Sequence, residues 1–171
     1  SVLLPEKDHY TLCLSTQVGC ALGCRFCLTG KRGFVRNLDP SEIIDQIIGV
    51  RATLPRGSKL TNLVLMGMGE PLENFQNVLP ALEVIRSPVG LQFSHRRVTV
   101  STVGIIPRMI DLFSRPNFVK LAISLNAATD QQRSKLMPIN RKYPLADLLA
   151  ACRKIPLADR EKITFEYVLI K

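Results

Sequence analysis

The chain has 171 residues, 46% of them hydrophobic, and a formal net charge of +9. This length allows one domain with its own core, and no apolar run approaches the length of a membrane span, so we expect a soluble, cytoplasmic protein without membrane contact. Five cysteines, three of them clustered, favour an intracellular metal site over a disulfide framework. The positive charge suits a nucleic acid partner, although a merely basic surface would account for it equally well.

The predicted elements alternate between strands and helices. Apolar alternation predicts a first strand over residues 9–18, and a capping and proline signature at 39–42 followed by isoleucines at helical spacing predicts a helix to residue 50. Further strands are predicted over 60–66, 97–103, 119–125 and 163–170, and further helices over 78–85, 105–113, from 129–130, and over 144–152. This alternation indicates an α/β fold of parallel βαβ units with five strands. From the pattern alone, a doubly wound sheet and a partial TIM-like barrel both remain open.

Every stretch whose residues could bind a ligand or take part in catalysis lies at the end of one of these strands. The three cysteines follow the first strand, Gly67–Pro71 follows the second, Ser101 closes the third and Ser124–Asn126 closes the fourth. The carboxyl ends of parallel strands meet at one edge, where α/β folds gather their chemistry. We therefore expect these stretches to converge.

Cys20, Cys24 and Cys27 are spaced so that three thiolates on one loop could bind three irons of a [4Fe–4S] cluster and leave the fourth iron open. The alternative is a structural zinc ion, which would need a fourth ligand. Cys13 lies seven residues upstream, but inside the predicted strand, so we favour the cluster. Taken alone, Cys13 is interpreted as a buried strand cysteine.

The cysteine spacing, with Phe26 directly before the last cysteine, resembles the signature of the radical S-adenosylmethionine (SAM) enzymes. Further stretches are similar to the branch of this family that methylates RNA, and the likeness covers essentially the whole chain: residues 13–20, 33–38, 66–72, 96–102, 136–140 and 166–168. The resemblance implies a radical SAM core, a partial TIM-like barrel with about five strands present. It also implies that residues 1–171 are a truncated core fragment, missing an N-terminal RNA-binding region and a C-terminal segment with a methyl-carrier cysteine.

The same resemblance implies roles for individual residues. Cys20, Cys24 and Cys27 would ligate the cluster, and Cys13 would be a catalytic cysteine that removes a proton from the methylated intermediate and resolves an RNA–enzyme adduct. Phe26 would pack near the adenine of SAM. The remaining SAM contacts would come from residues at the strand ends: Gly69, Glu70, Ser101, Ser124, Leu125 and Asn126. Asn126 departs from the family pattern, because many members have histidine there.

The implied activity is methylation of C2 of an adenosine in 23S rRNA and in tRNA, using two SAM molecules and an electron donor such as a flavodoxin-type reductant. We expect the fragment to bind the cluster and SAM without completing methyl transfer. A Cfr-like methyltransferase acting on C8 of the rRNA adenosine is the nearest alternative. A non-catalytic, zinc-stabilised RNA-binding module is a further alternative.

Other residues carry secondary expectations. Lys31, Arg32 and Arg36 follow the cysteine loop and could bring a phosphate backbone to the reactive centre, whereas Arg96 and Arg97 are expected only to flank a strand. Cys152 is expected in the core. An unpaired parallel edge predicts self-association or marginal stability of the fragment.

Overall fold

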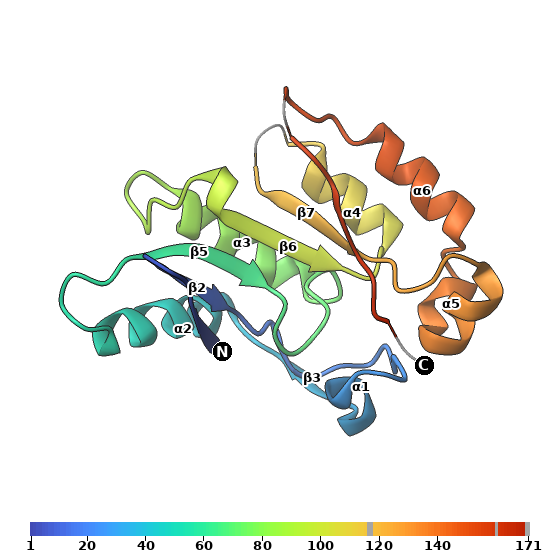
Figure 1. The fold of residues 1–171 in the computed structure, drawn as a ribbon, viewed down its shortest axis with the longest axis horizontal. Helices are drawn as coiled ribbons and strands as arrows, with labels where there is room; N and C mark the ends of the chain where they lie inside the picture. Colours follow the sequence, from blue (N-terminus) through green and yellow to red (C-terminus); the bar gives the residue numbers. More distant parts are fainter. Residues whose placement is uncertain (116–117, 160, 170–171) are drawn as a thin grey trace.

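A six-stranded, mostly parallel sheet forms the centre of the computed structural model, which describes residues 1–115, 118–159 and 161–169 (Figure 1). β1 runs antiparallel to β2, and all the other neighbours in this sheet are parallel. A separate antiparallel pair is formed by β3 (Gln17–Gly19) and β4 (Phe34–Asn37). In spatial order the strands of the main sheet are β1 (Val2–Pro5), β2 (Tyr10–Cys13), β5 (Leu60–Leu65), β6 (Val98–Thr102), β7 (Lys120–Ser124) and β8 (Thr164–Glu166).

The strand order distinguishes between the two expected architectures. A doubly wound sheet reverses its strand order at a switch point. Here each parallel strand is added beside the one before it, from β2 to β8, without reversal. The sheet is therefore part of a singly wound barrel, as the TIM-like interpretation predicts. The five parallel strands confirm the prediction, but the sequence did not predict β1. The strand expected over residues 9–18 is divided into β2 and β3.

Four longer helices connect the parallel strands. Right-handed crossovers between strands added in one direction place these helices on the same face of the sheet. In chain order they are α2 (Pro40–Thr53), α3 (Phe75–Arg86), α4 (Ile106–Phe113) and α6 (Leu145–Lys154). α2 begins where expected, with a capping box between Asp39 and Glu42 and a proline at its first turn. No helix in the described part of the chain is long and apolar enough to span a membrane.

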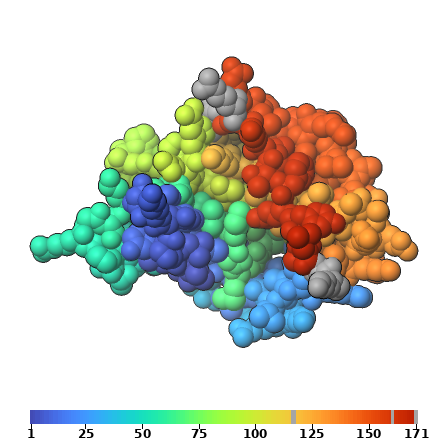
Figure 2. Space-filling model, in the orientation of Figure 1, coloured from blue at the N-terminus to red at the C-terminus, as the bar shows by residue number. Residues whose placement is uncertain are grey.

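Shorter elements lie between the longer ones. They are α1 (Leu28–Arg32), α5 (Asp130–Leu136) and 3₁₀ turns at His95–Arg97 and Pro138–Arg141. α5 begins as predicted, because the side chain of Thr129 accepts a hydrogen bond from the backbone of Gln132. Figure 2 shows the segment around α1 projecting at the lower edge of the molecule.

The pairing register shows which residues lie on each face of the sheet, because directly paired residues point to the same side. Leu12, Leu63 and Val98 form one row and are fully buried in the core. The opposite face carries the row Cys13, Val64, Thr99 and Lys120. Further along, the same face carries Ser101, Ser124 and Glu166. The side that corresponds to the inside of a barrel is therefore largely polar.

Candidate cofactor-binding site at the carboxyl ends of the strands

The cysteine loop is closed at its base by two glycines. The backbone N–H of Cys20 donates to the carbonyl oxygen of Gly33 at 3.0 Å. Gly19 has φ +80°, and a Cβ atom there would lie 1.9 Å from that same oxygen, so only glycine fits. At its far side the loop is attached to α5, because Arg25 N–H donates to the carbonyl of Leu136 at 2.8 Å.

Two thiols of this loop, those of Cys20 and Cys24, lie where burial disfavours the charged form. Cys24 is buried and Cys20 and Cys27 are half-buried. Burial raises the pKa of Cys20. The pKa of Cys24 is raised to about 12, chiefly by burial and to a smaller extent by the neighbouring Cys20 and Cys27. Among the described residues, no three His, Cys, Asp or Glu side chains already stand in a metal-binding arrangement. The chemistry of the donor set nevertheless fits a cluster, because cationic iron offsets the repulsion among three thiolates on one loop.

Cys13 lies at the end of β2, whereas the sequence predicted it inside a longer strand over residues 9–18. It is half-buried on the inner face of the sheet, where it pairs in register with Val64. Burial raises the pKa of its thiol, so the neutral form is favoured. Its place on the strand separates Cys13 from the loop that carries the other three cysteines.

The glycine-rich turn after β5 packs closely against the start of the cysteine hairpin. A Cβ atom on Gly67 would lie 2.6 Å from the carbonyl oxygen of Leu14. Gly69 has φ +101°, and its Cβ would lie 2.5 Å from Cβ of Gln17. Gln17 accepts a hydrogen bond from Glu70 N–H at 2.9 Å and donates to Asn37 at 2.8 Å. Gln17, only 3% exposed, thus joins the glycine-rich turn to the hairpin that carries the cysteines.

Glu70 is buried, and its carboxylate is engaged with the end of β6. It accepts hydrogen bonds from the Thr102 hydroxyl at 2.6 Å, from Val103 N–H at 3.0 Å and from Leu72 N–H at 3.1 Å. Burial raises the pKa of Glu70 to about 7, although these hydrogen bonds act in the opposite direction. The role expected of Glu70 and Gly69, binding the SAM amino group, stays a prediction.

Ser101 and Ser124 are brought together as expected, on the inner face of the sheet. Their hydroxyls lie 3.4 Å apart, and both donate to the same carboxylate oxygen of Glu166, at 2.6 and 3.0 Å respectively. Register explains the contact, since Glu166 of β8 pairs directly with Ser124 of β7. The three side chains form a polar cluster across three neighbouring strands, with an acceptor and two hydroxyls available to a polar ligand.

Arg133 is a fully buried arginine that joins α5 to the ends of β6 and β7. Its guanidinium donates to the carbonyl oxygens of Val103 at 2.7 Å, Ser124 at 3.2 Å and Leu125 at 3.0 Å. A fourth hydrogen bond, 2.9 Å long, reaches the side chain of Asn140. Burial lowers the pKa of Arg133, while the nearby Cys24 and Asp130 raise it. The Ser124–Asn126 backbone, which is expected to line the SAM pocket, is therefore bound by the buried guanidinium of Arg133.

Asn126 adopts a left-handed backbone conformation, with φ +59°. Its amide oxygen accepts from Val168 N–H at 3.0 Å, and its amide nitrogen lies 3.4 Å from the sulfur of Met137.

Beside Asn126, a hollow of about 630 Å³ extends between α5 and the segment after β8, with Lys135 and Tyr167 in its lining. This volume suits a small-molecule ligand. A larger hollow, about 810 Å³, lies at the opposite ends of the strands, away from the cysteines, and does not belong to this site.

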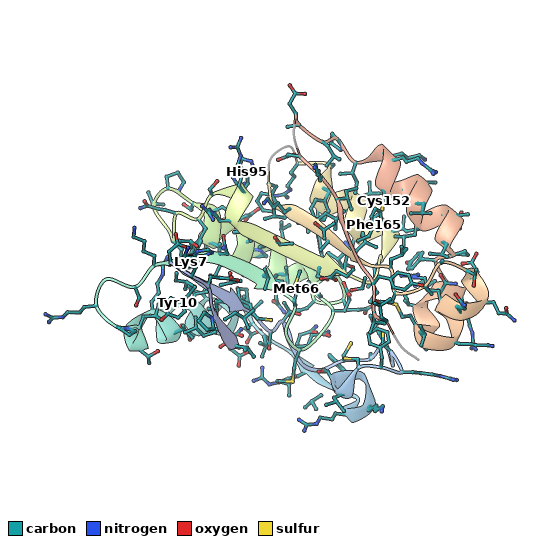
Figure 3. All side chains as sticks on the ribbon, viewed as in Figure 1. Lys7, Tyr10, Met66, His95, Cys152 and Phe165 are labelled. Atoms are coloured by element: carbon teal, nitrogen blue, oxygen red, sulfur yellow. The ribbon has the colours of Figure 1, made fainter. Side chains whose placement is uncertain are left out.

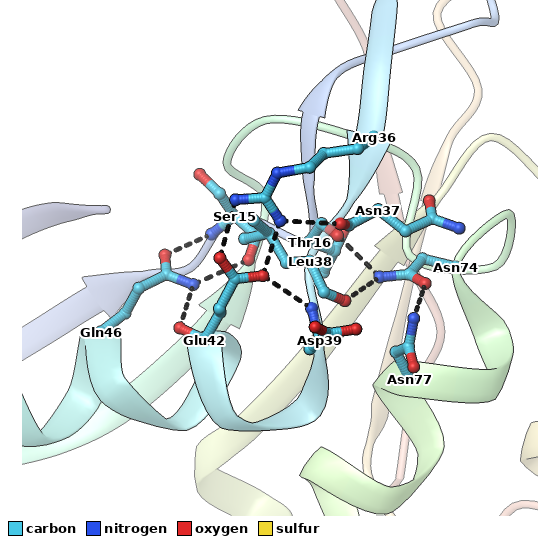
Figure 4. A network of polar contacts seen from close by, with 10 residues as sticks. All are labelled: Ser15, Thr16, Arg36, Asn37, Leu38, Asp39, Glu42, Gln46, Asn74 and Asn77. Carbon is cyan, nitrogen blue, oxygen red and sulfur yellow. Dashed lines mark hydrogen bonds and ion pairs between the residues drawn. The ribbon is translucent and has the colours of Figure 1, made fainter.

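A polar network supports the site from the helix side (Figure 4). Gln46 of α2 donates to the carbonyl of Ser15 and accepts from its N–H, both at 2.9 Å. Asn74 donates to the carbonyl oxygens of Thr16 and Leu38, at 2.7 and 2.8 Å. These contacts fix the backbone between β2 and β3, from which the cysteine loop begins.

One of the three basic residues after the cysteine loop belongs to the same network. Arg36 donates to both carboxylate oxygens of Glu42 at 2.7 Å, and this hydrogen bonding lowers the pKa of Glu42 to about 2. Arg36 is thus engaged within the molecule, whereas Lys31 and Arg32 are exposed at the end of α1. Arg97 does more than flank a strand, because it donates to Asn62 at 3.1 Å.

Other sequence-based expectations have mixed outcomes. Cys152 is buried in the core on α6, as expected (Figure 3). Phe26 is 38% exposed on the loop, and its contact with SAM stays a prediction, as does that of Leu125. Sequence reasoning missed Gln17, Arg133 and Glu166 as members of the site. Glu166 lies in a family-like stretch, but nothing local marks Arg133 as buried.

Comparisons with known proteins agree with this geometry. The family model described as "Radical SAM superfamily" matches residues 14–171. The "Dual-specificity RNA methyltransferase RlmN" of Desulfosudis oleivorans is 58% identical over 171 residues, covering 99% of this chain and 46% of the relative. "Dual-specificity RNA methyltransferase RlmN 2" of Myxococcus xanthus is 56% identical, covering 100% of this chain and 47% of the relative. The chain therefore spans about half the length of the curated relatives it matches.

A solved structure shows the same arrangement of the chain. The crystal structure of a radical SAM methyltransferase from Sphaerobacter thermophilus superposes with a TM-score of 0.91 at 44% sequence identity. The match covers 98% of this chain and 49% of that one. The family model matches nearly the whole sequence, the parallel strands form part of a barrel, and three cysteines lie on the loop after β3. The chain therefore belongs to the radical SAM superfamily.

Proposed function

We propose that this chain is the catalytic core of an RNA methyltransferase that acts on C2 of an adenosine in 23S rRNA and in tRNA. The names of the relatives support this activity, and their matches, 58% and 56% identical, cover 99% and 100% of this chain. Because the chain spans about half of those relatives, we assign it the cofactor-binding and radical-generating part of the reaction. We place the activity in the cytoplasm, with a flavodoxin-type protein as electron donor.

One observation carries the proposal. The cysteine loop, the glycine-rich turn and the Ser101–Ser124–Glu166 cluster lie at the same ends of adjacent parallel strands. Gln17 connects the first two, and the contact between Arg25 and Leu136 connects the loop to α5, where Arg133 holds the ends of β6 and β7. These contacts support a site in which the cysteine loop would bind the cluster beside a polar surface that would bind SAM.

Named residues account for the binding steps. Cys20, Cys24 and Cys27 would hold the cluster, which when bound supplies the electron that cleaves SAM to a 5′-deoxyadenosyl radical. The backbone of the Gly67–Glu70 turn and the hydroxyls of Ser101 and Ser124 would orient SAM, with Asn126 at its edge. Cys13 lies on the inner face and would accept the proton from the methylated adenine carbon. Its raised pKa means that it must first be deprotonated.

The proposal is tested by anaerobic reconstitution with iron and sulfide, followed by electron paramagnetic resonance (EPR) of the reduced protein. We expect a [4Fe–4S] signal that changes on addition of SAM, and its loss in Cys24→Ala. Cys152→Ala serves as the matched control and should keep the signal, because Cys152 lies in the core of α6. Stoichiometric zinc in place of iron, or a cluster signal that does not respond to SAM, would contradict the proposal. Product analysis with the full-length protein then distinguishes methylation at C2 from methylation at C8.

A further inference from the structure

The segment that follows the cysteine loop forms an exposed surface beside the site. We call it the post-cysteine surface and define it by Leu28, Lys31, Arg32, Phe34 and Val35. α1 buries none of its residues, and every residue of β4 is exposed. The three apolar side chains are 75%, 47% and 68% exposed, for Leu28, Phe34 and Val35 in that order. Neighbours on a strand point to opposite faces, so the exposure of both Phe34 and Val35 shows that both faces are open at the start of β4.

This surface is rooted directly on the cysteine loop. Lys31 N–H donates to the carbonyl of Cys27 at 3.2 Å, and the carbonyl of Gly33 accepts from Cys20 N–H at 3.0 Å. Figures 1 and 2 show α1 and its surroundings projecting from the rest of the molecule. A molecule bound to the post-cysteine surface would therefore lie next to the cofactor site.

The charge of the segment has one sign. Residues 21–38 contain four basic side chains and no acidic one. Arg36 is held by Glu42, but none of the ion pairs found among the described residues involves Lys31 or Arg32. The two cations in the last turn of α1 are thus free to meet an external anion. Beside them, Phe34 offers an aromatic face.

We propose that the post-cysteine surface binds an unpaired stretch of the substrate RNA. The proposal rests on the function proposed above and adds to it a binding site for the nucleic acid. Cations that neutralise phosphates, next to an exposed aromatic ring on which a base can stack, are the chemistry with which proteins hold single-stranded RNA. An acidic protein would match the same charges, and the test below distinguishes it from RNA.

The test measures binding of a fluorescently labelled RNA hairpin, with an adenosine in its loop, by anisotropy at several salt concentrations. The chain is reconstituted anaerobically beforehand. The variants are the double substitution K31A/R32A and Phe34→Ala. The matched controls are R56A/K59A, an exposed basic pair between α2 and β5 at the opposite ends of the strands, and Ile110→Ala, an exposed apolar residue on α4. All the substituted side chains are at the surface, so unfolding does not confound the comparison.

We expect K31A/R32A to reduce the slope of log K against log salt by about 1.4, as for two lost contacts to single-stranded RNA phosphates. We expect Phe34→Ala to weaken binding at least about fivefold, as for one lost base stack. Both controls should bind like the wild type. Equal affinity and slope in all proteins, or no RNA binding by the wild type, would overturn the proposal.

A second readout separates this proposal from the proposed function. EPR with and without SAM reports on the cofactor site in every variant, independently of RNA. A SAM-responsive cluster with unchanged RNA binding in the variants would disprove the post-cysteine surface alone. Loss of RNA binding in the variants of a chain that holds no cluster would support the surface and contradict the proposed function. Unchanged RNA binding with slower cluster reduction by flavodoxin, but not by dithionite, would reassign the surface to the electron donor and overturn the proposal.

Discussion

Arg133 donates its Nε hydrogen to the carbonyl oxygen of Leu125 at 3.0 Å, and the same guanidinium reaches the end of β6 through the carbonyl of Val103. One buried side chain therefore sets the spacing between two strand ends that line the candidate site. Asn140 continues the network, accepting from Arg133 and donating to the carboxylate of Asp130 at 2.9 Å. The side-chain amide of Asn140 thus connects the guanidinium of Arg133 to the carboxylate of Asp130.

Replacing Arg133 with methionine should strongly destabilise the fold. Four acceptors around a fully buried side chain would lose their donor, and each polar group left unsatisfied in the interior costs about 1–3 kcal/mol. Urea unfolding followed by circular dichroism measures this loss. Arg141→Met, at an exposed position on the neighbouring 3₁₀ turn, is the control and should change stability little. Similar stability of both variants would show that Arg133 does not hold the strand ends.

The titration of Glu70 should make the stability of the cofactor-free chain fall as pH rises. Its pKa is raised from 4.5 to about 7, chiefly by burial, so the native state binds the proton more tightly than the unfolded state does. The associated stability is fully present below pH about 4.5 and is lost by pH about 7, a change of roughly 3 kcal/mol. Urea midpoints between pH 4.5 and 8, compared with Glu70→Gln, test this. Parallel curves for the two proteins would mean that Glu70 does not titrate in this range.

Substituting Gly69 with alanine should loosen the link between the glycine-rich turn and the cysteine hairpin. A Cβ atom would lie 2.5 Å from Gln17, and φ +101° is unfavourable for any residue with a side chain. We expect a loss of about 1–3 kcal/mol in the free energy of unfolding and weaker SAM binding by calorimetry. Gly49→Ala is the control: it lies within α2 with open space around it, and should stabilise by about 0.5–1 kcal/mol. Unimpaired SAM binding and stability in Gly69→Ala would contradict the close packing.

Replacing Gln46 with leucine should destabilise the backbone from which the cysteine loop begins. The change removes both hydrogen bonds to Ser15 and leaves a partly buried N–H and carbonyl without a protein partner. The expected loss is about 1–3 kcal/mol, measured by urea unfolding. Gln76→Leu on α3, where the side chain is exposed, gives the matched comparison. Equal effects of the two substitutions would exclude a specific role for the contact with Ser15.

Several features follow from the sequence without a structure. Apolar periodicity predicts the five parallel strands and the helices between them, because burial of one face imposes a repeat that can be read locally. The spacing of Cys20, Cys24 and Cys27 predicts a metal-binding loop, since three donors within eight residues must lie close together. The position of the candidate motifs after strands predicts their convergence, because parallel strands share one carboxyl edge.

The tertiary structure decides the rest, since it depends on partners far apart in the chain. Glu166 reaches Ser101 only because β8 pairs with β7, which in turn pairs with β6. Gln17 likewise meets Glu70 across a separation of 53 residues. The charge of Arg36 shows the same limit. Its sequence context predicts a free cation, but its guanidinium donates to both carboxylate oxygens of Glu42 on α2. A local pattern states which side chains are polar or charged. Which of them remain available to a cofactor or an RNA is determined by contacts that form only when the chain folds.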